Sequence, residues 1–338
     1  MMRRVGILGA GSWGTALGLL LESNGFEVII WSIDKQEVKM LQEEREHVTK
    51  LPGIKLPPTM VITSNIKEAI EEVEFCVLAV PSPFTRSTAR LMSPYVKQDQ
   101  IIVDVAKGIE EITLMTLSEQ IQEEIPQAKI AVLSGPSHAE EVGKGLTTSV
   151  VVGAKEKQTA EWIQEAFMNE KFRVYINPDV LGIELGGSLK NVVALAAGIA
   201  DGLGCGDNAK AALITRGVAE MCRLGIAMGG KAETFAGLTG IGDLIVTCSS
   251  EHSRNRRAGY LIGKGLTMEE AQAEVKMVVE GVYSAKAAKK LGTKYNVRMP
   301  LIDEVNKVLF EGKSAQIALK DLMLRDGTIE HQDLEDAW

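Results

Sequence analysis

The chain has 338 residues, 45% of them hydrophobic, which is enough to bury a large core and suggests about two domains. Its formal net charge of -8 at pH 7 argues against a general nucleic-acid binder or a membrane-surface protein, because both need a broadly positive surface. Any anionic ligand must therefore be met by local cations.

The first predicted strand, residues 5–8, runs directly into a glycine-rich loop and then into a helix over residues 15–24. Gly9, Gly11 and Gly14 have the GxGxxG spacing. In this motif the first glycine permits a tight turn, the second lets the backbone approach a pyrophosphate, and the third lets the helix pack on the strand. The helix also directs its positive end at the phosphates. The stretch predicts a dinucleotide-binding βαβ unit.

A second strand over residues 26–31 supports this interpretation. Asp34 follows it, roughly 20 residues past the last glycine, where an acid that binds the cofactor ribose is expected. After Asp34 the sequence predicts a charged helix over residues 36–50 and a proline-rich turn over residues 51–58.

Six further apolar runs are separated by stretches that are mostly of helix length, and this alternation predicts a parallel sheet with helices on both faces. The fold class is therefore α/β, with a Rossmann-type doubly wound sheet. Open sheets of this kind bind ligands at the carboxyl ends of their strands, where loops 81–83, 106–108 and 135–138 lie. The six runs are residues 60–63, 75–80, 101–105, 130–133, 149–152 and 172–176, with a helix expected over 157–169.

From about residue 179 the pattern changes from strand to helix. Apolar-rich helices are predicted over residues 181–203 and 208–228, with shorter helices to the end. Thr267 and Glu270 have the spacing of a capping box, and Pro300 suits the first turn of another helix.

The change of pattern predicts a dinucleotide-binding Rossmann-like domain over residues 1–178 and an all-helical substrate-binding and catalytic domain over 179–338, with an acidic tail. The N-terminus does not resemble a signal peptide, and no uninterrupted apolar run reaches the roughly 18 residues of a membrane span. The four cysteines are far apart and lie mostly in apolar surroundings. They predict buried free thiols in a reducing cytoplasm.

Lys190 lies in a strongly apolar predicted helix, so its ammonium must either reach a cleft or lose its hydration. Desolvation lowers the pKa of a lysine toward neutrality, which suits a group that exchanges a proton with a carbonyl or hydroxyl oxygen. The alternative is a lysine that extends to solvent near a helix end. Gly186, Gly187 and Asn191 favour a site, because small residues permit close approach and an amide can hold a ligand.

Three further side chains could complete such a site. Lys107 follows a central strand and would point into the cofactor crevice, with an ordinary surface lysine as the alternative. Asp243 ends a glycine-rich turn over residues 237–243 and could orient Lys190 or a hydroxyl, or cap a helix. His138, also after a strand, is a rival proton donor.

The densest cation cluster covers residues 253–257 and contains Arg254, Arg256 and Arg257. In an acidic protein such a patch suits a phosphate monoester through bidentate guanidinium contacts, although a solvated helix face is the ordinary alternative.

The sequence contains no HExxH, no paired-carboxylate motif, no GxSxG and no P-loop. Metal-dependent hydrolysis, acyl transfer and phosphoryl transfer therefore lack support, and no metal is expected.

Seven motifs, in order, strongly resemble bacterial NAD(P)-dependent glycerol-3-phosphate dehydrogenase, and the match runs from Val5 to about Arg325. The resemblance implies an oxidoreductase that transfers hydride reversibly between NAD(P)H and dihydroxyacetone phosphate, giving sn-glycerol 3-phosphate for phospholipid biosynthesis. The motifs are residues 9–14, 106–108, 135–137, 187–191, 240–243, 253–255 and 278–281.

The resemblance assigns Lys190 as the general acid and base. It implies a substrate site made of Lys107, Gly135, Ser137, Lys190, Asp243, Ser253, Arg254 and Asn255. It implies a cofactor site made of the motif glycines Gly9, Gly11 and Gly14 together with Ser12, Trp13, Lys107, Ala139, Arg254, Val278 and Glu280.

Two departures limit what the resemblance implies. Relatives often place Arg or His just after the second strand, where a cation can face a 2'-phosphate, but this chain has Ser32, Ile33 and Asp34. The cofactor is therefore NAD or NADP. The tail over residues 326–338 has no family role that we can name.

Two rival functions share the order of a dinucleotide domain followed by helices. One is a 3-hydroxyacid or 6-phosphogluconate type dehydrogenase, whose substrate carries a carboxylate. The other is a non-catalytic redox sensor that binds NAD(P), which would have no need for Lys107, Lys190 and Asp243 together. The expected partner is a small triose phosphate rather than nucleic acid or membrane, and a homodimer is the candidate assembly.

Overall fold

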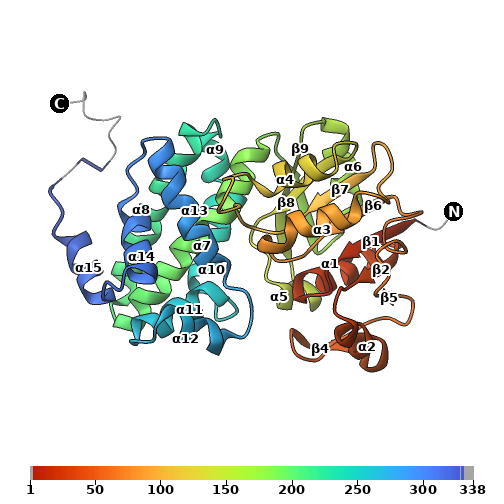
Figure 1. Cartoon of the computed structure of the whole chain (residues 1–338), viewed down its shortest axis with the longest axis horizontal. Helices are drawn as coiled ribbons and strands as arrows, with labels where there is room; N and C mark the ends of the chain where they lie inside the picture. The colour runs from red at the N-terminus through yellow and green to blue at the C-terminus, as the bar shows by residue number, and fades with distance from the viewer. Residues whose placement is uncertain (1–2, 328, 331–338) are drawn as a thin grey trace.

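The computed structural model describes residues 3–327, 329 and 330, and Figure 1 shows two bodies side by side along the long axis. The N-terminal part of the chain forms a sheet flanked by helices, and the C-terminal part forms a group of helices. The predicted fold class, a Rossmann-type doubly wound sheet followed by a helical region, is therefore confirmed.

Eight strands form the main sheet. They are β1 (Arg4–Leu8), β2 (Glu27–Trp31), β5 (Val61–Thr63), β6 (Phe75–Leu78), β7 (Ile101–Asp104), β8 (Lys129–Ser134), β9 (Thr148–Ala154) and β10 (Phe172–Ile176). Their spatial order is β10-β9-β8-β7-β6-β1-β2-β5. Since β1 pairs in parallel with both β2 and β6, the winding of the chain reverses between β1 and β6. This is the switch point at which open α/β sheets bind ligands.

Two strands, β9 and β10, run opposite to the parallel sheet that the sequence predicted, because β10 pairs in parallel with β9. β9 runs antiparallel to β8, with Ser134 opposite Val151. A parallel return needs a crossover of a dozen or more residues, usually a helix that runs the length of the strands. The helix in this link, α5 (Ala139–Gly143), has five residues and is too short for that. β9 therefore starts at the end of the sheet where β8 stops.

Helices cover both faces of the sheet, as the sequence predicted. One buried core lies on each face, and the side chains of β1 divide between them: Val5 and Ile7 enter the first core and Leu8 the second. Successive side chains of a strand point to opposite faces, so both faces of β1 are buried. The covering helices are α1 (Ser12–Ser23) and α6 (Lys157–Phe167) on the first face, and α3 (Thr85–Met92) and α4 (Leu117–Glu124) on the second.

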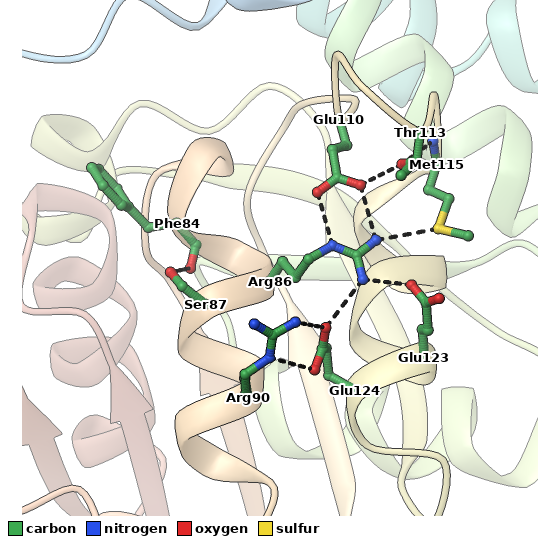
Figure 2. A network of polar contacts seen from close by, with 9 residues as sticks. All are labelled: Phe84, Arg86, Ser87, Arg90, Glu110, Thr113, Met115, Glu123 and Glu124. Atoms are coloured by element: carbon green, nitrogen blue, oxygen red, sulfur yellow. Dashed lines mark hydrogen bonds and ion pairs between the residues drawn. The ribbon is translucent and has the colours of Figure 1, made fainter.

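Figure 2 shows a network of charged side chains that joins α3 to α4. Arg86 donates from Nε and Nη2 to the two carboxylate oxygens of Glu110, at 2.8 and 2.9 Å. Arg90 donates to both oxygens of Glu124, at 2.7 and 3.0 Å, and Arg86 Nη1 reaches the same carboxylate at 3.2 Å. Bidentate pairs of this kind fix orientation as well as distance. The network therefore holds the two helices in register on this face.

The segment after β2 differs from its prediction. α2 (Lys35–Glu44) is shorter than the helix predicted over residues 36–50. The predicted turn over residues 51–58 contains a strand, because β3 (Glu46–His47) pairs antiparallel with β4 (Leu51–Lys55).

The early end of α2 has a local and a tertiary cause. Arg45 has a φ of +50°, the left-handed conformation that commonly ends a helix. Beyond it, His47 is buried, and its Nε2 lies 2.9 Å from Glu37 Oε1 of α2. The hydrophobic pattern of the sequence contained no sign of this contact.

One long helix, α7 (Val180–Leu203), forms the centre of the C-terminal part, and its residues 182–200 are all buried. It is long and apolar enough to cross a membrane, but 89% of its most apolar 18-residue window is buried inside the protein, so it is a core helix. The surrounding helices are α8 (Gly206–Ala227), α9 (Ala232–Phe235), α10 (Asp243–Ser249), α11 (Arg254–Gly263), α12 (Met268–Val275), α13 (Glu280–Lys294), α14 (Pro300–Phe310) and α15 (Ala315–Met323).

Close packing fixes α11 against α7. A Cβ added to Gly198 of α7 would lie 2.0 Å from the carbonyl oxygen of Arg256 in α11, so only glycine permits this approach. As a result, the N-terminus of α11, with Arg254, is held at a set position relative to Lys190.

Two predicted helix starts are confirmed. Glu270 N donates to Thr267 Oγ1 at 3.2 Å and Thr267 N donates to the Glu270 carboxylate at 2.8 Å, which completes the capping box of α12. Pro300 is the first residue of α14. The domain boundary between residues 178 and 179 stays a proposal, and it falls between the end of β10 and the start of α7.

Candidate active site

The loop between β1 and α1 has the strand, turn and helix geometry predicted for its glycines. Gly9 has a φ of +121°, which residues with a side chain rarely adopt. A Cβ on Gly14 would lie 2.0 Å from Gly9 O, so α1 packs directly on the loop. A Cβ on Gly11, in contrast, would meet no atom of the described residues within 4 Å. The fold needs Gly9 and Gly14, whereas the space beside Gly11 can receive the phosphates of a ligand.

Gly11→Ala is expected to separate cofactor binding from folding. Because φ is -64° and the space is open, alanine fits the free protein, and we expect an unchanged melting temperature. The methyl group would obstruct a pyrophosphate, so the Kd for NADH should rise roughly tenfold or more, ~1.4 kcal/mol. Fluorescence titration with NADH and thermal unfolding measure the two effects. Gly327→Ala, at another glycine with no described neighbour within 4 Å, is the matched control, and unaltered NADH affinity of Gly11→Ala would contradict the assignment.

Other predicted cofactor residues lie near this loop. Ser12 and Trp13 begin α1, and both are partly exposed. Asp34 follows β2 and caps α2, because its Oδ1 accepts a hydrogen bond from Gln36 N at 2.8 Å. The predicted contacts of these three side chains with a cofactor stay predictions.

Two lysines from different parts of the chain share one carboxylate. Lys190 of α7 donates from Nζ to Asp243 Oδ1 at 2.8 Å, and Lys107, after β7, donates to Asp243 Oδ2 at 2.6 Å. The side chains of Lys107, Lys190 and Asp243 are 17%, 7% and 2% exposed. Asp243 is the first residue of α10 and Gly242 is its N-cap, so the alternative prediction of a capping aspartate is wrong. The structure thus brings together the three side chains that the sequence had only grouped as candidates.

Burial determines the charge balance of this centre. It lowers the pKa of Lys190 to about 8; Asp243 opposes this shift, and the charge of Lys107 adds to it. Burial alone would raise the pKa of Asp243, but the charges and hydrogen bonds of the two lysines bring it below its ordinary value. A buried lysine with a pKa of about 8 can gain or lose a proton near neutral pH, as a general acid and base requires.

Sequence reasoning missed Thr247, which completes the surroundings of Lys190. Lys190 Nζ donates to Thr247 Oγ1 at 2.6 Å, and this hydroxyl also contacts Asp243 O at 2.6 Å. Residues four apart share one face of a helix, so the spacing of Asp243 and Thr247 would have indicated the contact if Asp243 had been predicted inside a helix rather than as its cap.

The loop after β8 lies against Lys107. Lys107 Nζ donates to Gly135 O at 3.0 Å, and Ser137 Oγ donates to the same oxygen at 2.9 Å. Ala139 is buried and begins α5. His138, the rival proton donor, lies between Ser137 and Ala139 in the chain. It is not a hydrogen-bond partner of Lys190 Nζ, which donates to Asp243 and Thr247.

The arginines of the cation cluster differ in their partners, and both Arg254 and Arg257 are exposed. Arg256 pairs with Asp201 at 2.8 Å and Arg257 with Glu274 at 3.7 Å. Arg254 is exposed, and its Nη1 donates to Val278 O at 3.2 Å. Of the three guanidinium groups, that of Arg254 is therefore the best placed to bind a ligand.

The residues beside Arg254 hold helices together. Ser253 caps α11, accepting a hydrogen bond from Arg256 N at 3.2 Å. Asn255 donates from Nδ2 to Asn191 Oδ1 at 2.9 Å and accepts from Gly281 N at 2.8 Å, so it joins α11 to α7 and α13. Their predicted contacts with substrate stay predictions.

Glu280 links the helical part to the switch point of the sheet. Its Oε1 accepts from Ser82 N at 3.0 Å, and its Oε2 accepts from Ser82 Oγ. Burial raises the pKa of Glu280, and the hydrogen bonds from Ser82 partly oppose this shift.

Sequence reasoning treated residues 81–83 as a loop after a strand and missed Ser82. No pattern marked it, because its partner is 198 positions away.

Within residues 3–327, 329 and 330, no group of three or more His, Cys, Asp or Glu side chains could hold a metal ion. All four cysteines are free thiols, as predicted. Cys76 and Cys248 are buried, but Cys205 and Cys222 are partly exposed, so the prediction of burial holds for two of them.

The chain matches two family models. The one described as the N-terminus of NAD-dependent glycerol-3-phosphate dehydrogenase matches residues 4–160, and the one described as the C-terminus of the same enzyme matches residues 179–320.

Individual proteins are similar over nearly their whole length. A glycerol-3-phosphate dehydrogenase (NAD(P)+) of Agathobacter rectalis is 66% identical over 99% of each chain. One of Fusobacterium nucleatum is 55% identical over 98% of this chain and 99% of its own. The crystal structure of glycerol-3-phosphate dehydrogenase from Coxiella burnetii has a TM-score of 0.93 at 39% identity, covering 96% of this chain and 99% of that one.

Proposed function

The chain belongs to the NAD-dependent glycerol-3-phosphate dehydrogenase family, and from this premise we propose that it reversibly reduces dihydroxyacetone phosphate to sn-glycerol 3-phosphate with NADH or NADPH. The observation that carries the proposal is the carboxylate of Asp243 shared by Lys107 and Lys190. It holds a proton-exchanging ammonium at the junction of the sheet and the helices. The product would supply glycerophospholipid biosynthesis.

In this reaction Lys190 is the proton donor and acceptor. A bound nicotinamide cofactor supplies hydride to the carbonyl carbon. Lys190 Nζ gives its proton to the carbonyl oxygen, which becomes a hydroxyl, and the amine is left neutral. Asp243 and Thr247 hold Nζ in position. In the reverse direction the neutral amine takes the proton of the hydroxyl, and a pKa of about 8 lets both directions run near neutral pH.

The substrate site that we propose surrounds this ammonium and extends to Arg254. Lys107 is partly accessible and positively charged, so it can bind the hydroxyls or the phosphate of a triose phosphate. Arg254 offers a guanidinium at the N-terminus of α11. The full set is Lys107, Gly135, Ser137, Lys190, Asp243, Ser253, Arg254 and Asn255.

The cofactor site that we propose begins at the open space beside Gly11 and passes the switch point of the sheet. The contact of Glu280 with Ser82 places this carboxylate there, beside the loop after β6. The full set is Gly9, Gly11, Ser12, Trp13, Gly14, Lys107, Ala139, Arg254, Val278 and Glu280.

Arg254→Gln is expected to raise the KM for dihydroxyacetone phosphate roughly 10- to 100-fold, because a hydrogen bond between charged groups contributes about 1.5–3 kcal/mol. The kcat should fall as well if phosphate binding helps to orient the carbonyl. Initial rates at varied substrate measure both constants. Arg257→Gln, which removes an exposed arginine paired with Glu274, is the matched control. An unchanged KM in Arg254→Gln would refute the phosphate assignment.

Initial rates with dihydroxyacetone phosphate and each reduced cofactor test the proposed function directly and decide between NADH and NADPH. Turnover of a carboxylate-bearing substrate instead would favour a 3-hydroxyacid or 6-phosphogluconate type dehydrogenase. Cofactor binding without turnover of any ketose phosphate would favour a redox sensor.

We further propose a homodimer in the cytoplasm. The free thiols support a reducing compartment. Exposed apolar side chains of the C-terminal region, Ile317, Met323 and Leu324, support a subunit contact. Sedimentation equilibrium measures the assembly, and a monomer at micromolar concentration would refute the dimer.

A further inference from the structure

Two histidines face each other across the junction of the sheet and the helices. His138 follows Ser137 in the loop after β8, and His252 precedes Ser253 at the start of α11. Their ring centroids are 5.9 Å apart, and the ring planes are inclined by 58°. The ring contact therefore brings together the loop after β8 and the start of α11, the two stretches of chain that we propose for the substrate.

One ring nitrogen of this pair is left without a partner. His138 Nε2 is buried, and it has no hydrogen-bond partner in the part of the chain that the structure describes. Buried polar groups of native proteins are nearly always hydrogen-bonded, so an exception beside a ligand site suggests that the ligand brings the missing partner. An oxygen atom of a phosphate, which accepts hydrogen bonds, would suit an N–H at this position.

The charges that face His138 come from four elements besides the loop of His252. They are Lys190 on α7, Lys107 after β7, Asp243 on α10 and Glu140 on α5. Burial has the largest effect and lowers the pKa of His138. The two lysines lower this pKa further, whereas Glu140 and Asp243 raise it. The charged form of the ring is therefore disfavoured in the free protein. An arriving phosphate dianion adds negative charge beside it and favours the protonated ring.

We propose that His138 and His252 together bind the phosphate group of the substrate from the two sides of the junction, in addition to Arg254. This inference rests on the proposed function. The cofactor also carries phosphates, but the loop that would hold its pyrophosphate follows β1. His138 follows Ser137 and His252 precedes Ser253, two residues of the proposed substrate site, while Ala139, next to His138, belongs to the proposed cofactor site. Substrate binding then favours uptake of a proton at His138, so the KM for substrate should rise as the pH increases.

Substitution of each histidine by glutamine tests this role in the full-length enzyme. We expect His138→Gln and His252→Gln each to raise the KM for dihydroxyacetone phosphate roughly tenfold, with kcat changed less than about threefold and the KM for NADH unaltered. In the double variant the rise of the substrate KM with pH, between about pH 6 and 8, should become smaller than in wild type. Lys144→Gln removes an exposed cation at the other end of α5 and is the matched control.

Each other outcome has a defined meaning. An unchanged substrate KM and pH profile in both variants would overturn the histidine pair, and a loss confined to the KM for NADH would assign the rings to the cofactor and overturn it equally. His252 is exposed, so His252→Gln decides the question if His138→Gln does not fold. A wild-type protein without turnover would defeat the proposed function instead. Calorimetric titration with inorganic phosphate then tests the pair alone, and binding equal in wild type and variants would refute it.

Discussion

Lys190→Ala is expected to lower kcat about 10²- to 10⁴-fold, the span usual for loss of a general acid or base. The variant has no group at the position of Nζ, which lies 2.8 Å from Asp243 and 2.6 Å from Thr247. The affinity for NADH should change little, because the cofactor loop follows β1. Steady-state rates and NADH titration measure both effects.

The control for this variant must also remove one lysine and must leave the fold intact. Lys264→Ala serves, because Lys264 is the C-cap of α11 and lies beside Tyr260 at the surface. Circular dichroism checks that Lys190→Ala is folded, since alanine at this position leaves Asp243 with one lysine partner. A folded Lys190→Ala enzyme that turns over at the rate of wild type would remove Lys190 from the mechanism.

Asp243→Asn is expected to lower kcat about 10²-fold or more, because the change keeps the shape of the side chain but removes the charge that orients both lysines. Two ammonium groups would then lie close together in a buried site. Since Asp243 raises the pKa of Lys190, its loss should bring that pKa below the parent value of about 8.

The sign of the pH dependence follows from the role of Lys190. Reduction of the ketone needs the protonated amine, so its rate falls as the pH rises through the pKa of Lys190, about 8 in the parent enzyme. Oxidation of the alcohol needs the neutral amine, so its rate rises over the same range. In Asp243→Asn both limbs should move to lower pH.

Profiles of kcat against pH in the two directions measure this shift. Asp321→Asn removes another lysine-paired aspartate, which is exposed and bound to Lys313, and should leave both profiles in place. If the kcat profiles of Asp243→Asn are unchanged, or are displaced to higher pH, then Asp243 does not set the pKa of Lys190.

Much of the fold could be predicted because its signals are local. The spacing of Gly9, Gly11 and Gly14, the apolar run around Lys190 and the capping box at Thr267 each depend on a few neighbouring residues. These signals located the glycine-rich loop after β1, the central helix and the start of α12. They also identified Lys107, Lys190 and Asp243 as candidates, but with an ordinary structural alternative for each.

The predictions that failed depended on tertiary contacts or on the length of a connection. Because α5 is short, β9 runs antiparallel to β8 instead of parallel, and α2, which contacts His47 through Glu37, ends earlier than predicted. Ser82 and Thr247 were missed, since Glu280 and Lys190, which they contact, lie 198 and 57 positions away in the sequence.

By itself, then, the sequence determined which groups this protein has available: a glycine loop for phosphates, a lysine in an apolar helix, and arginines in an acidic chain. Only the tertiary structure decided how they are used. It placed one aspartate between two lysines. It paired Arg256 and Arg257 with carboxylates but Arg254 with the carbonyl oxygen of Val278, and it set two histidine rings 5.9 Å apart. The physical reason is that the charge and hydrogen bonding of a side chain depend on its neighbours in space, which residue patterns along the chain do not specify.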